Sequence, residues 1–329
     1  MQETGTGMGT TAIKDRRRLG ASEIEVSALG VGVWAWGDKG LWGYGKAYGV
    51  QDVKEAYRAA LEAGIDLFDT AEIYGGGRSE RLLGRCIRWA GSPVVVASKF
   101  APLPYRLGTK ALLTALDASL ERLGTDHIDL YQIHWPYSLL PIEGLMERMA
   151  EAFRAGKIRA VGVSNYSAGQ MLTAHRALAR RGIPLASNQV HYSLLHRTPE
   201  ANNVLDTCRR LNVALIAYSP LAQGVLTGKY SGEGAAQVSL QRRLTPLIRQ
   251  ANRPETVELI GVLQEIAKDR GKTLGQVAIN WLLCQDHLVI PIPGAKNGRQ
   301  AEQNAGVLGW RLSEEECARI DQASLPWLR

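Results

Sequence analysis

Four side chains that could move or hold a proton each follow an apolar run of the chain: Asp69, Tyr74, Lys99 and His134. A phenol can donate a proton to a reacting oxygen, although its unperturbed pKa is about 10. A nearby ammonium favours the phenolate, so we expect Lys99 to lower the pKa of Tyr74. A carboxylate at Asp69 would keep Lys99 charged and oriented, and pairing reduces the cost of burying both. His134 could donate a hydrogen bond to a substrate oxygen and orient it.

Each of these residues also has an ordinary structural interpretation. An aspartate after a strand often caps a turn, a lysine at a strand tip is often solvated, and a histidine can be a satisfied core residue. The functional interpretation gains weight because all four residues follow neighbouring predicted strands at the same end. Side chains converge at that end of a barrel, where active sites form.

One pattern repeats along the chain and predicts the elements that position these residues. Short apolar runs predict strands at Leu29–Val33, Ile65–Phe68, Val94–Ala97, Ile128–Ile133, Ile158–Val163, Leu185–Val190, Val213–Ala217 and Leu288–Ile290. Longer amphipathic segments between them predict helices at Val53–Ala63, Ser79–Trp89, Lys110–Leu123, Ile142–Ala155, Ala168–Arg180, Glu200–Leu211 and Thr256–Arg270. Continuous apolar runs are typical of strands buried on both faces. The sequence therefore predicts an α/β fold, a (β/α)8 TIM barrel.

Three further segments complete this organisation. Arg17–Ala28 alternates like a β-hairpin and is expected to cap the bottom of the barrel. Leu221–Asn252 is expected to be a long loop after the seventh strand. Residues 1–15 are expected to be a flexible tail and 16–329 a single domain. Gly30-Val-Gly32 begins a formal match to the dinucleotide fingerprint, but the aromatic and glycine-rich stretch after it is no helix, so a Rossmann site is not expected.

Composition narrows the class of protein. The chain has 329 residues, 22% of them charged, with a net charge of +7, and no long uncharged apolar run, so we expect no membrane partner. Its positive charges are dispersed without interleaved aromatics, which argues against a nucleic-acid partner. The four cysteines are far apart in sequence and the six histidines form no ligand pair, so reduced thiols and no metal site are expected. We expect a cytoplasmic monomer or weak homo-oligomer.

Five segments resemble the signatures of the aldo-keto reductase family, in that family's order. They are Gly64–Gly75, Val161–Ser167, Asn188–Val190, Ala217–Leu221 and Ile292–Lys296. The resemblance covers about Leu19 to Trp310 and is similar in detail to the bacterial and plant branch with pyridoxal-reductase-like and channel-β-like members. It implies that Asp69, Tyr74, Lys99 and His134 form a catalytic tetrad. A histidine at this place in the family suits carbonyl reduction.

The resemblance also implies NADPH (NADP⁺) as cofactor, lying across the barrel mouth. Ser164, Asn165 and Gln189 would hold the carboxamide, and Tyr218 would stack on the nicotinamide. The full set of implied cofactor residues is Gly32, Val33, Trp34, Asp69, Ser164, Asn165, Gln189, Tyr218, Ser219, Pro220, Leu221, Ala222, Gln223, Gly224, Lys229, Arg243, Gly294, Lys296, Gln300, Gln303 and Asn304. Gln300 stands where many relatives have arginine, and Gln303 where many have glutamate. Lys296 still offers a cation for the 2′-phosphate.

The expected function is NADPH-dependent reduction of an aldehyde or ketone, with Tyr74 as general acid. Trp34, Tyr74, His134 and Trp135 are the expected substrate contacts, and the substrate is a small carbonyl compound: an aldehyde, pyridoxal, a keto sugar or a steroid. Trp36, Trp42 and Tyr44 could also line this pocket or pack the barrel top. A different class of function is also open: an NADPH-binding, redox-sensing regulatory subunit with incidental turnover.

Overall fold

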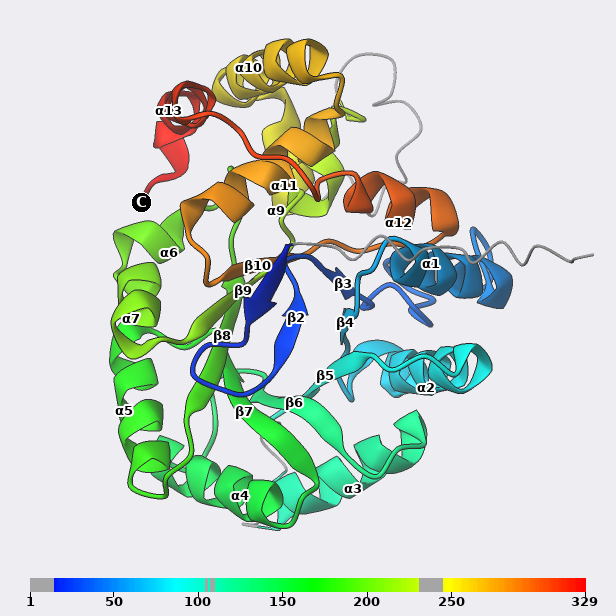
Figure 1. Cartoon of the computed structure of the whole chain (residues 1–329), viewed down its shortest axis with the longest axis vertical. Coiled ribbons are helices and arrows are strands. Elements are labelled where there is room, and N and C mark those ends of the chain that lie inside the picture. Colours follow the sequence, from blue (N-terminus) through cyan, green and yellow to red (C-terminus); the bar gives the residue numbers. More distant parts are fainter. Residues whose placement is uncertain (1–14, 104–105, 107–109, 231–244) are drawn as a thin grey trace, which may run out of the picture.

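Eight parallel strands form a barrel in the computed structural model, which describes residues 15–103, 106, 110–230 and 245–329 (Figure 1). In the order in which they pair, the strands are β3 (Gly30–Gly32), β4 (Leu67–Asp69), β5 (Val95–Phe100), β6 (Ile128–Ile133), β7 (Ile158–Ser164), β8 (Leu185–His191), β9 (Ala214–Tyr218) and β10 (Val289–Ile292). The ring closes where the Gly32 amide donates to the Pro293 carbonyl, 3.1 Å away. The predicted TIM barrel is confirmed.

Helices surround the strands as the amphipathic segments predict. They are α1 (Val50–Glu62), α2 (Arg78–Ala90), α3 (Ala111–Leu123), α4 (Ile142–Arg154), α5 (Ala168–Ala179), α7 (Val204–Leu211) and α10 (Pro254–Arg270). Most of their bounds differ from the expected ones by three residues or fewer. Within the described part of the chain, no helix is long and apolar enough to cross a membrane.

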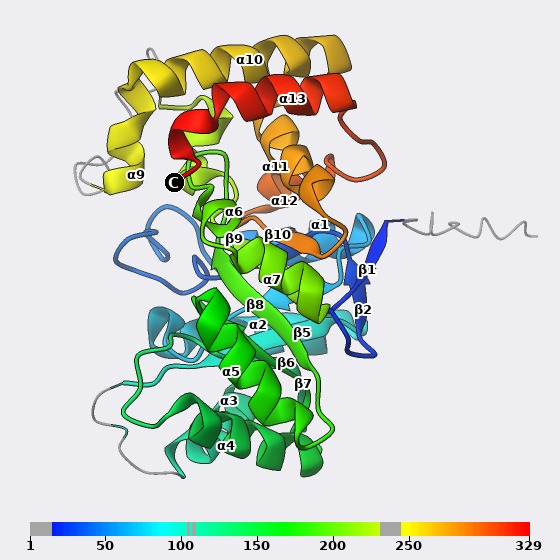
Figure 2. The same cartoon turned by 90° about the vertical axis from the view of Figure 1, so that its left-hand side faces the viewer.

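The predicted hairpin is present as β1 (Arg16–Arg18) and β2 (Glu25–Ser27), paired antiparallel. Leu19, Ile24 and Val26 pack into the same buried cluster as the inward-facing residues of the barrel strands. The hairpin thus closes one end of the barrel, and Figure 2 shows it on the opposite side from the segment that joins β3 to α1. It leaves the other end for a site.

The barrel interior changes from apolar to polar along the strands. Leu67, Ala97 and Leu130 belong to the apolar cluster above the hairpin. Side chains on a strand return to the same face every second residue, so the next inward positions on these three strands are Asp69, Lys99 and Gln132. All three are buried. The strand register therefore gathers polar groups at the carboxyl end of the barrel.

Several helices differ from the sequence expectation. The segment expected as one helix at Glu200–Leu211 is two, α6 (Thr198–Ala201) and α7, because Asn203 between them adopts a left-handed φ of 63°. Besides the short α9 described below, three helices of the described part were not expected: α11 (Leu274–Gln285), α12 (Gly298–Ala305) and α13 (Glu314–Ala323). Most of α11 is buried and apolar around its circumference, so it lacks the polar face of an amphipathic helix, and α12 is short and mostly polar.

The described residues directly after β9, 219–230, lie at the carboxyl end of the barrel. The described parts of the segment between β9 and α10 contain the 3₁₀ turns η2 (Ala222–Thr227) and η4 (Gln250–Asn252) and the short helix α9 (Pro246–Arg249). The expected long loop thus carries short helical pieces on both sides of residues 231–244, which lie outside the described part. The expected tail, 1–15, falls almost wholly outside it too, and the domain boundary stays a prediction.

Candidate active site at the barrel mouth

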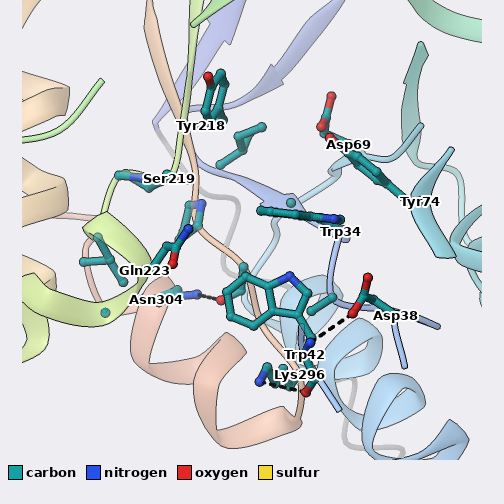
Figure 3. A pocket seen from close by; sticks show the side chains of 18 of the residues that line it. Trp34, Asp38, Trp42, Asp69, Tyr74, Tyr218, Ser219, Gln223, Lys296 and Asn304 are labelled. Carbon is teal, nitrogen blue, oxygen red and sulfur yellow. Dashed lines mark hydrogen bonds between the residues drawn. The ribbon is translucent and has the colours of Figure 1, made fainter. Parts of the chain in front are cut away.

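A cavity of about 570 Å³ lies at the carboxyl ends of the strands (Figure 3). Asp69 at the end of β4, His134 after β6, Asn165 after β7 and Tyr218 at the end of β9 all line it. These residues come from four different strands, and the parallel register brings their carboxyl ends to one rim. The cavity therefore lies at the end of the barrel where the sequence predicts the site.

Asp69 and Lys99 form a buried ion pair on the floor of this cavity. Nζ of Lys99 lies 2.5 Å from Oδ1 of Asp69, and the two side chains are 0% and 4% exposed. Nζ also donates to the Thr70 carbonyl at 2.8 Å. Burial lowers the pKa of Lys99, and the attraction of Asp69 opposes that effect. The pair thus fixes one positive charge at a defined point below the cavity.

The second oxygen of Asp69 accepts hydrogen bonds from two glutamines. Gln189 Nε2 lies 2.7 Å from Oδ2, and Gln132 Nε2 lies 3.2 Å from it. Gln132 was not among the expected site residues. It stands two residues before His134 and pairs in register with Lys99 across β5 and β6, a relationship visible only once the strands are aligned. In this structure the Gln189 amide is directed to the carboxylate.

Tyr74 is held beside the pair by a turn that needs glycine. Gly75 has a φ of +56°, and a Cβ there would lie 2.7 Å from the Gly37 carbonyl oxygen. Glycine adopts this conformation without steric cost. The Lys99 ammonium lies 5.1 Å from the centre of the Tyr74 ring, and the His134 ring meets it edge to face at 5.7 Å. Three of the four expected catalytic residues line the cavity, and Lys99 lies behind them.

The expectation that Lys99 lowers the pKa of Tyr74 is wrong for this structure. Removal of the phenol from water raises its pKa well above 10, and the Asp69 charge raises it further. The sequence indicated the cation but not the extent of burial, nor the effect of the Asp69 charge on the phenol. Tyr74 is therefore a protonated donor at neutral pH.

His134 is a neutral imidazole. Burial, together with repulsion from Lys99, lowers its pKa to about 2. Among the described residues its Nδ1 has no hydrogen-bond partner. A buried polar atom without a partner is costly and uncommon, so this ring is suited to a ligand that the cavity receives.

Asn165 and Tyr218 form a polar and aromatic wall of the cavity. Asn165 has a left-handed φ of 60°, donates to the His134 carbonyl at 3.1 Å and accepts from the Tyr218 hydroxyl at 3.1 Å. Ser164 lies behind them and donates to the Gln189 carbonyl. This network fixes the plane of the Tyr218 ring at the cavity.

The turn after Tyr218 is strained. Ser219, Ala222 and Gln223 have φ values of 52°, 47° and 55°, a conformation that non-glycine residues rarely adopt. Such strain persists where the surroundings enforce it, often at ligand sites. The Lys229 side chain packs against Gly224 in this turn and lines the cavity.

A second lysine, Lys296, lines the cavity from the segment that follows β10, the neighbour of β9 in the barrel. Nζ of Lys296 donates to the Trp42 carbonyl at 3.3 Å and lies 4.8 Å from the Trp42 ring (Figure 3). Gln300 Oε1 accepts from the Lys296 amide, and Asn304 Nδ2 donates to the Gly294 carbonyl. The cavity thus has a cation at each of two walls.

Most of the residues implied for the cofactor line the cavity. Those that do are Gly32, Trp34, Asp69, Asn165, Gln189, Tyr218, Ser219, Pro220, Leu221, Gln223, Gly224, Lys229, Gly294, Lys296, Gln300, Gln303 and Asn304. Val33, Ser164 and Ala222 are buried and do not line it, and Arg243 lies outside the described residues. Lining residues that were not expected include Asp38, Ile73 and Thr227.

Tryptophans make the apolar wall next to Tyr74. Trp34 lies 6.1 Å from the Tyr74 ring and meets Trp42 edge to face at 5.5 Å. Trp135 also lines the cavity. Trp36 is fully buried instead, and its indole donates to the Ala295 carbonyl. These aromatics were expected either to line the pocket or to pack the barrel top. Trp42 lines the pocket, and Trp36 packs the barrel.

The fold and the site place this chain among α/β-barrel proteins with a polar, aromatic-walled cavity at the carboxyl end of the barrel. Comparisons with known proteins show the family. Residues 28–325 match the Aldo/keto reductase family, and the chain belongs to it. It is 42% identical over 314 residues to "Pyridoxal reductase, chloroplastic" of Arabidopsis thaliana, covering 92% of this chain and 84% of that one. It is 33% identical over 327 residues to "L-glyceraldehyde 3-phosphate reductase" of Escherichia coli (strain K12), covering 93% and 91%.

The chain also resembles a solved structure that contains a bound cofactor. An aldo/keto reductase from Klebsiella pneumoniae, in complex with NADP and acetate, superposes with a TM-score of 0.71 at 29% identity, covering 94% of this chain and 95% of that one. The expected family and its bacterial and plant relatives are confirmed. Family membership supports an oxidoreductase that acts on carbonyl compounds.

Proposed function

We propose that this chain reduces aldehydes or ketones to alcohols with NADPH, and that Tyr74 is the general acid. The observation that carries the proposal is the convergence of Tyr74 and His134 on one cavity, directly above the buried Lys99–Asp69 pair. When bound, NADPH would supply a hydride. The chain must then hold the carbonyl group and deliver a proton to its oxygen.

Tyr74 provides that proton. Because burial keeps the phenol protonated, it is a donor over the whole neutral range. Proton donation to an oxygen that gains charge in the transition state typically contributes 10²–10⁴-fold to a rate. Lys99, 5.1 Å from the ring centre, stabilises negative charge left on the tyrosine after transfer.

His134 orients the carbonyl. Its pKa of about 2 excludes an imidazolium at neutral pH, so it acts as a neutral hydrogen-bond donor. Its ring stands edge to face with that of Tyr74. Both residues line the same cavity, and in the proposed mechanism one carbonyl oxygen accepts a hydrogen bond from each.

The cavity residues fit a phosphorylated dinucleotide. Lys229 lies beside the strained Ser219–Gly224 turn and Lys296 follows β10, and both offer cations to phosphates. Asn165 and Gln189 offer amide groups for the carboxamide, and Tyr218 offers a planar face for the nicotinamide. Gln300, Gln303 and Asn304 would hold the adenosine end. NADPH is favoured over NADH because Lys296 can pair with a 2′-phosphate.

Trp34, Trp42 and Trp135 favour carbonyl substrates with an apolar or aromatic body, since concave sites bind ligands mainly through such walls. A relative is named for pyridoxal, an aromatic aldehyde, and another for a phosphorylated triose. We infer that aromatic aldehydes are the better class for this pocket.

The experiment is steady-state consumption of NADPH with a panel of aromatic, aliphatic and sugar aldehydes. Quenching of NADPH fluorescence measures cofactor binding independently. Turnover with at least one aldehyde class supports the reductase. Tight NADPH binding without turnover of any member would contradict it and favour the regulatory subunit.

A further inference from the structure

Two of the four cysteines lie together outside the barrel mouth, although they are far apart in the sequence. Cys284 is near the end of α11 and Cys317 is in α13, and both are half-buried. Cys86 and Cys208 are buried. Figure 2 shows α13 packed across α10, on the outside of the barrel. The pair plays no part in the proposed reduction.

Two hydrogen bonds hold the chain on either side of Cys317 against α11. The Asn280 Oδ1 atom accepts from the Leu312 amide at 3.0 Å, just before α13 begins. The Trp281 indole donates to Oδ1 of Asp321 at 3.0 Å, one turn after Cys317. The stretch that carries Cys317 is therefore fixed at both ends on the helix that carries Cys284.

Helix periodicity directs both cysteine side chains into this frame. Sγ of Cys284 lies 3.5 Å from Oδ1 of Asn280, on the side where Leu312 is bound. Cys284 lies one turn after Asn280 on α11, and Cys317 lies one turn before Asp321 on α13, so both side chains point into the contact between the two helices. Each thiol is the largest influence on the pKa of the other. A disulfide can close without large backbone movement between side chains that face each other across such a contact.

The surroundings of the two sulfurs are unequal. The pKa of Cys284 is lowered to about 7, although burial opposes the change. The causes are hydrogen bonding with the Cys317 thiol and the Leu312 amide, and the positive charges of Arg311 and Arg17. The bond to Cys284, burial and the charges of Asp321 and Glu316 raise the pKa of Cys317. Positive charges therefore lie near Cys284 and negative charges near Cys317, an arrangement that favours the thiolate, and so the nucleophile, at Cys284.

We propose that Cys284 and Cys317 form an oxidation-sensitive dithiol that closes to a disulfide when a peroxide attacks the chain. The Cys284 thiolate attacks one peroxide oxygen, the O–O bond breaks, and a sulfenic acid forms. The Cys317 thiol then attacks the sulfenic sulfur, the S–O bond breaks, and water leaves. In sum, two thiols and one hydrogen peroxide give one disulfide and two waters.

The disulfide would close a loop that contains β10 and α12. This loop carries Lys296, Gln300 and Asn304 at one wall of the cavity. Oxidation would therefore place a covalent crosslink across the ends of a segment that contributes residues to the proposed cofactor site. The dithiol itself does not depend on whether the chain is a reductase.

The test is oxidation of the reduced full chain with one equivalent of hydrogen peroxide. Thiols are counted after unfolding, and peptides are mapped by mass under non-reducing conditions. We expect the four thiols to fall to two and a Cys284–Cys317 peptide to appear. Four thiols remaining, or a crosslink that involves Cys86 or Cys208, would overturn the proposal.

Three variants sharpen the result. Cys317→Ser should prevent the crosslink and leave a sulfenic acid at position 284 that dimedone traps, whereas Cys284→Ser should leave position 317 unmodified. Cys208→Ala is the matched control and should crosslink like the original chain. In the original chain, alkylation at pH 7 should be at least about tenfold faster at Cys284 than at Cys317. Equal rates would overturn the assignment of Cys284 as the nucleophile.

Discussion

Tyr74 and His134 meet edge to face at the barrel mouth, with ring centroids 5.7 Å apart and ring planes at 79°. Both residues line one cavity, and the Lys99 ammonium lies 5.1 Å from the centre of the tyrosine ring. One side chain is a protonated phenol and the other a neutral imidazole. The proposed reduction depends on this division between a proton donor and an orienting hydrogen bond.

Replacing His134 by alanine should lower kcat/KM for aldehydes by about 10²–10³-fold, the effect typical of one lost oxyanion donor. NADPH affinity should change little, because His134 is assigned to the substrate. The measurement is kcat/KM with one aldehyde, alongside fluorescence titration with NADPH. His287→Ala, at an exposed histidine, is the matched control. An unchanged kcat/KM would remove His134 from the mechanism.

The pH profile should follow the raised pKa of Tyr74. Reduction requires the protonated phenol, so its rate is lost only as pH rises through that pKa. Because burial places this pKa well above 10, kcat/KM for reduction should stay flat up to about pH 10. His134, with a pKa of about 2, should add no step between pH 5 and 8. A loss of reduction centred below pH 10, with the fold intact by circular dichroism, would mean that the Lys99 charge prevails over burial.

Breaking the buried ion pair should destabilise the fold strongly. Lys99→Met leaves Asp69 as an uncompensated buried charge, and such changes typically cost about 3–5 kcal/mol in the free energy of unfolding. The double variant Asp69→Asn with Lys99→Met removes both charges and should be less destabilised than Lys99→Met alone. The measurement is the free energy of unfolding in urea for Lys99→Met, for Asp69→Asn and for the double variant. Additive losses would show that the two residues act independently.

Lys296→Ala should weaken NADPH binding about 10- to 100-fold, which corresponds to the loss of one charge-assisted hydrogen bond. NADH binding should change much less, because NADH lacks the 2′-phosphate. Lys272→Ala, a lysine packed on Trp310 away from the cavity, controls for net charge. An equal loss of affinity for the two cofactors would mean that Lys296 does not bind the 2′-phosphate.

The sequence predicts the barrel and much of the candidate site for one physical reason. Parallel strands bring their carboxyl ends together, so Asp69, Lys99 and His134 converge once their runs are recognised as strands. The contact of Gln132 with Asp69 depends on strand alignment, and the pKa direction of Tyr74 depends on burial depth. The contact between Cys284 and Cys317 depends on how α11 and α13 pack. None of these three follows from spacing along the chain.

The most direct test of the account is single-turnover reduction of one aromatic aldehyde by the Tyr74→Phe variant with bound NADPH. The change removes one hydroxyl, so NADPH affinity should stay close to that of the original chain while reduction falls by about 10²–10⁴-fold. Tyr137→Phe, at an exposed tyrosine after β6, should retain full activity. If Tyr74→Phe keeps more than about a tenth of the original rate, Tyr74 is not the proton donor, and the proposed mechanism is wrong.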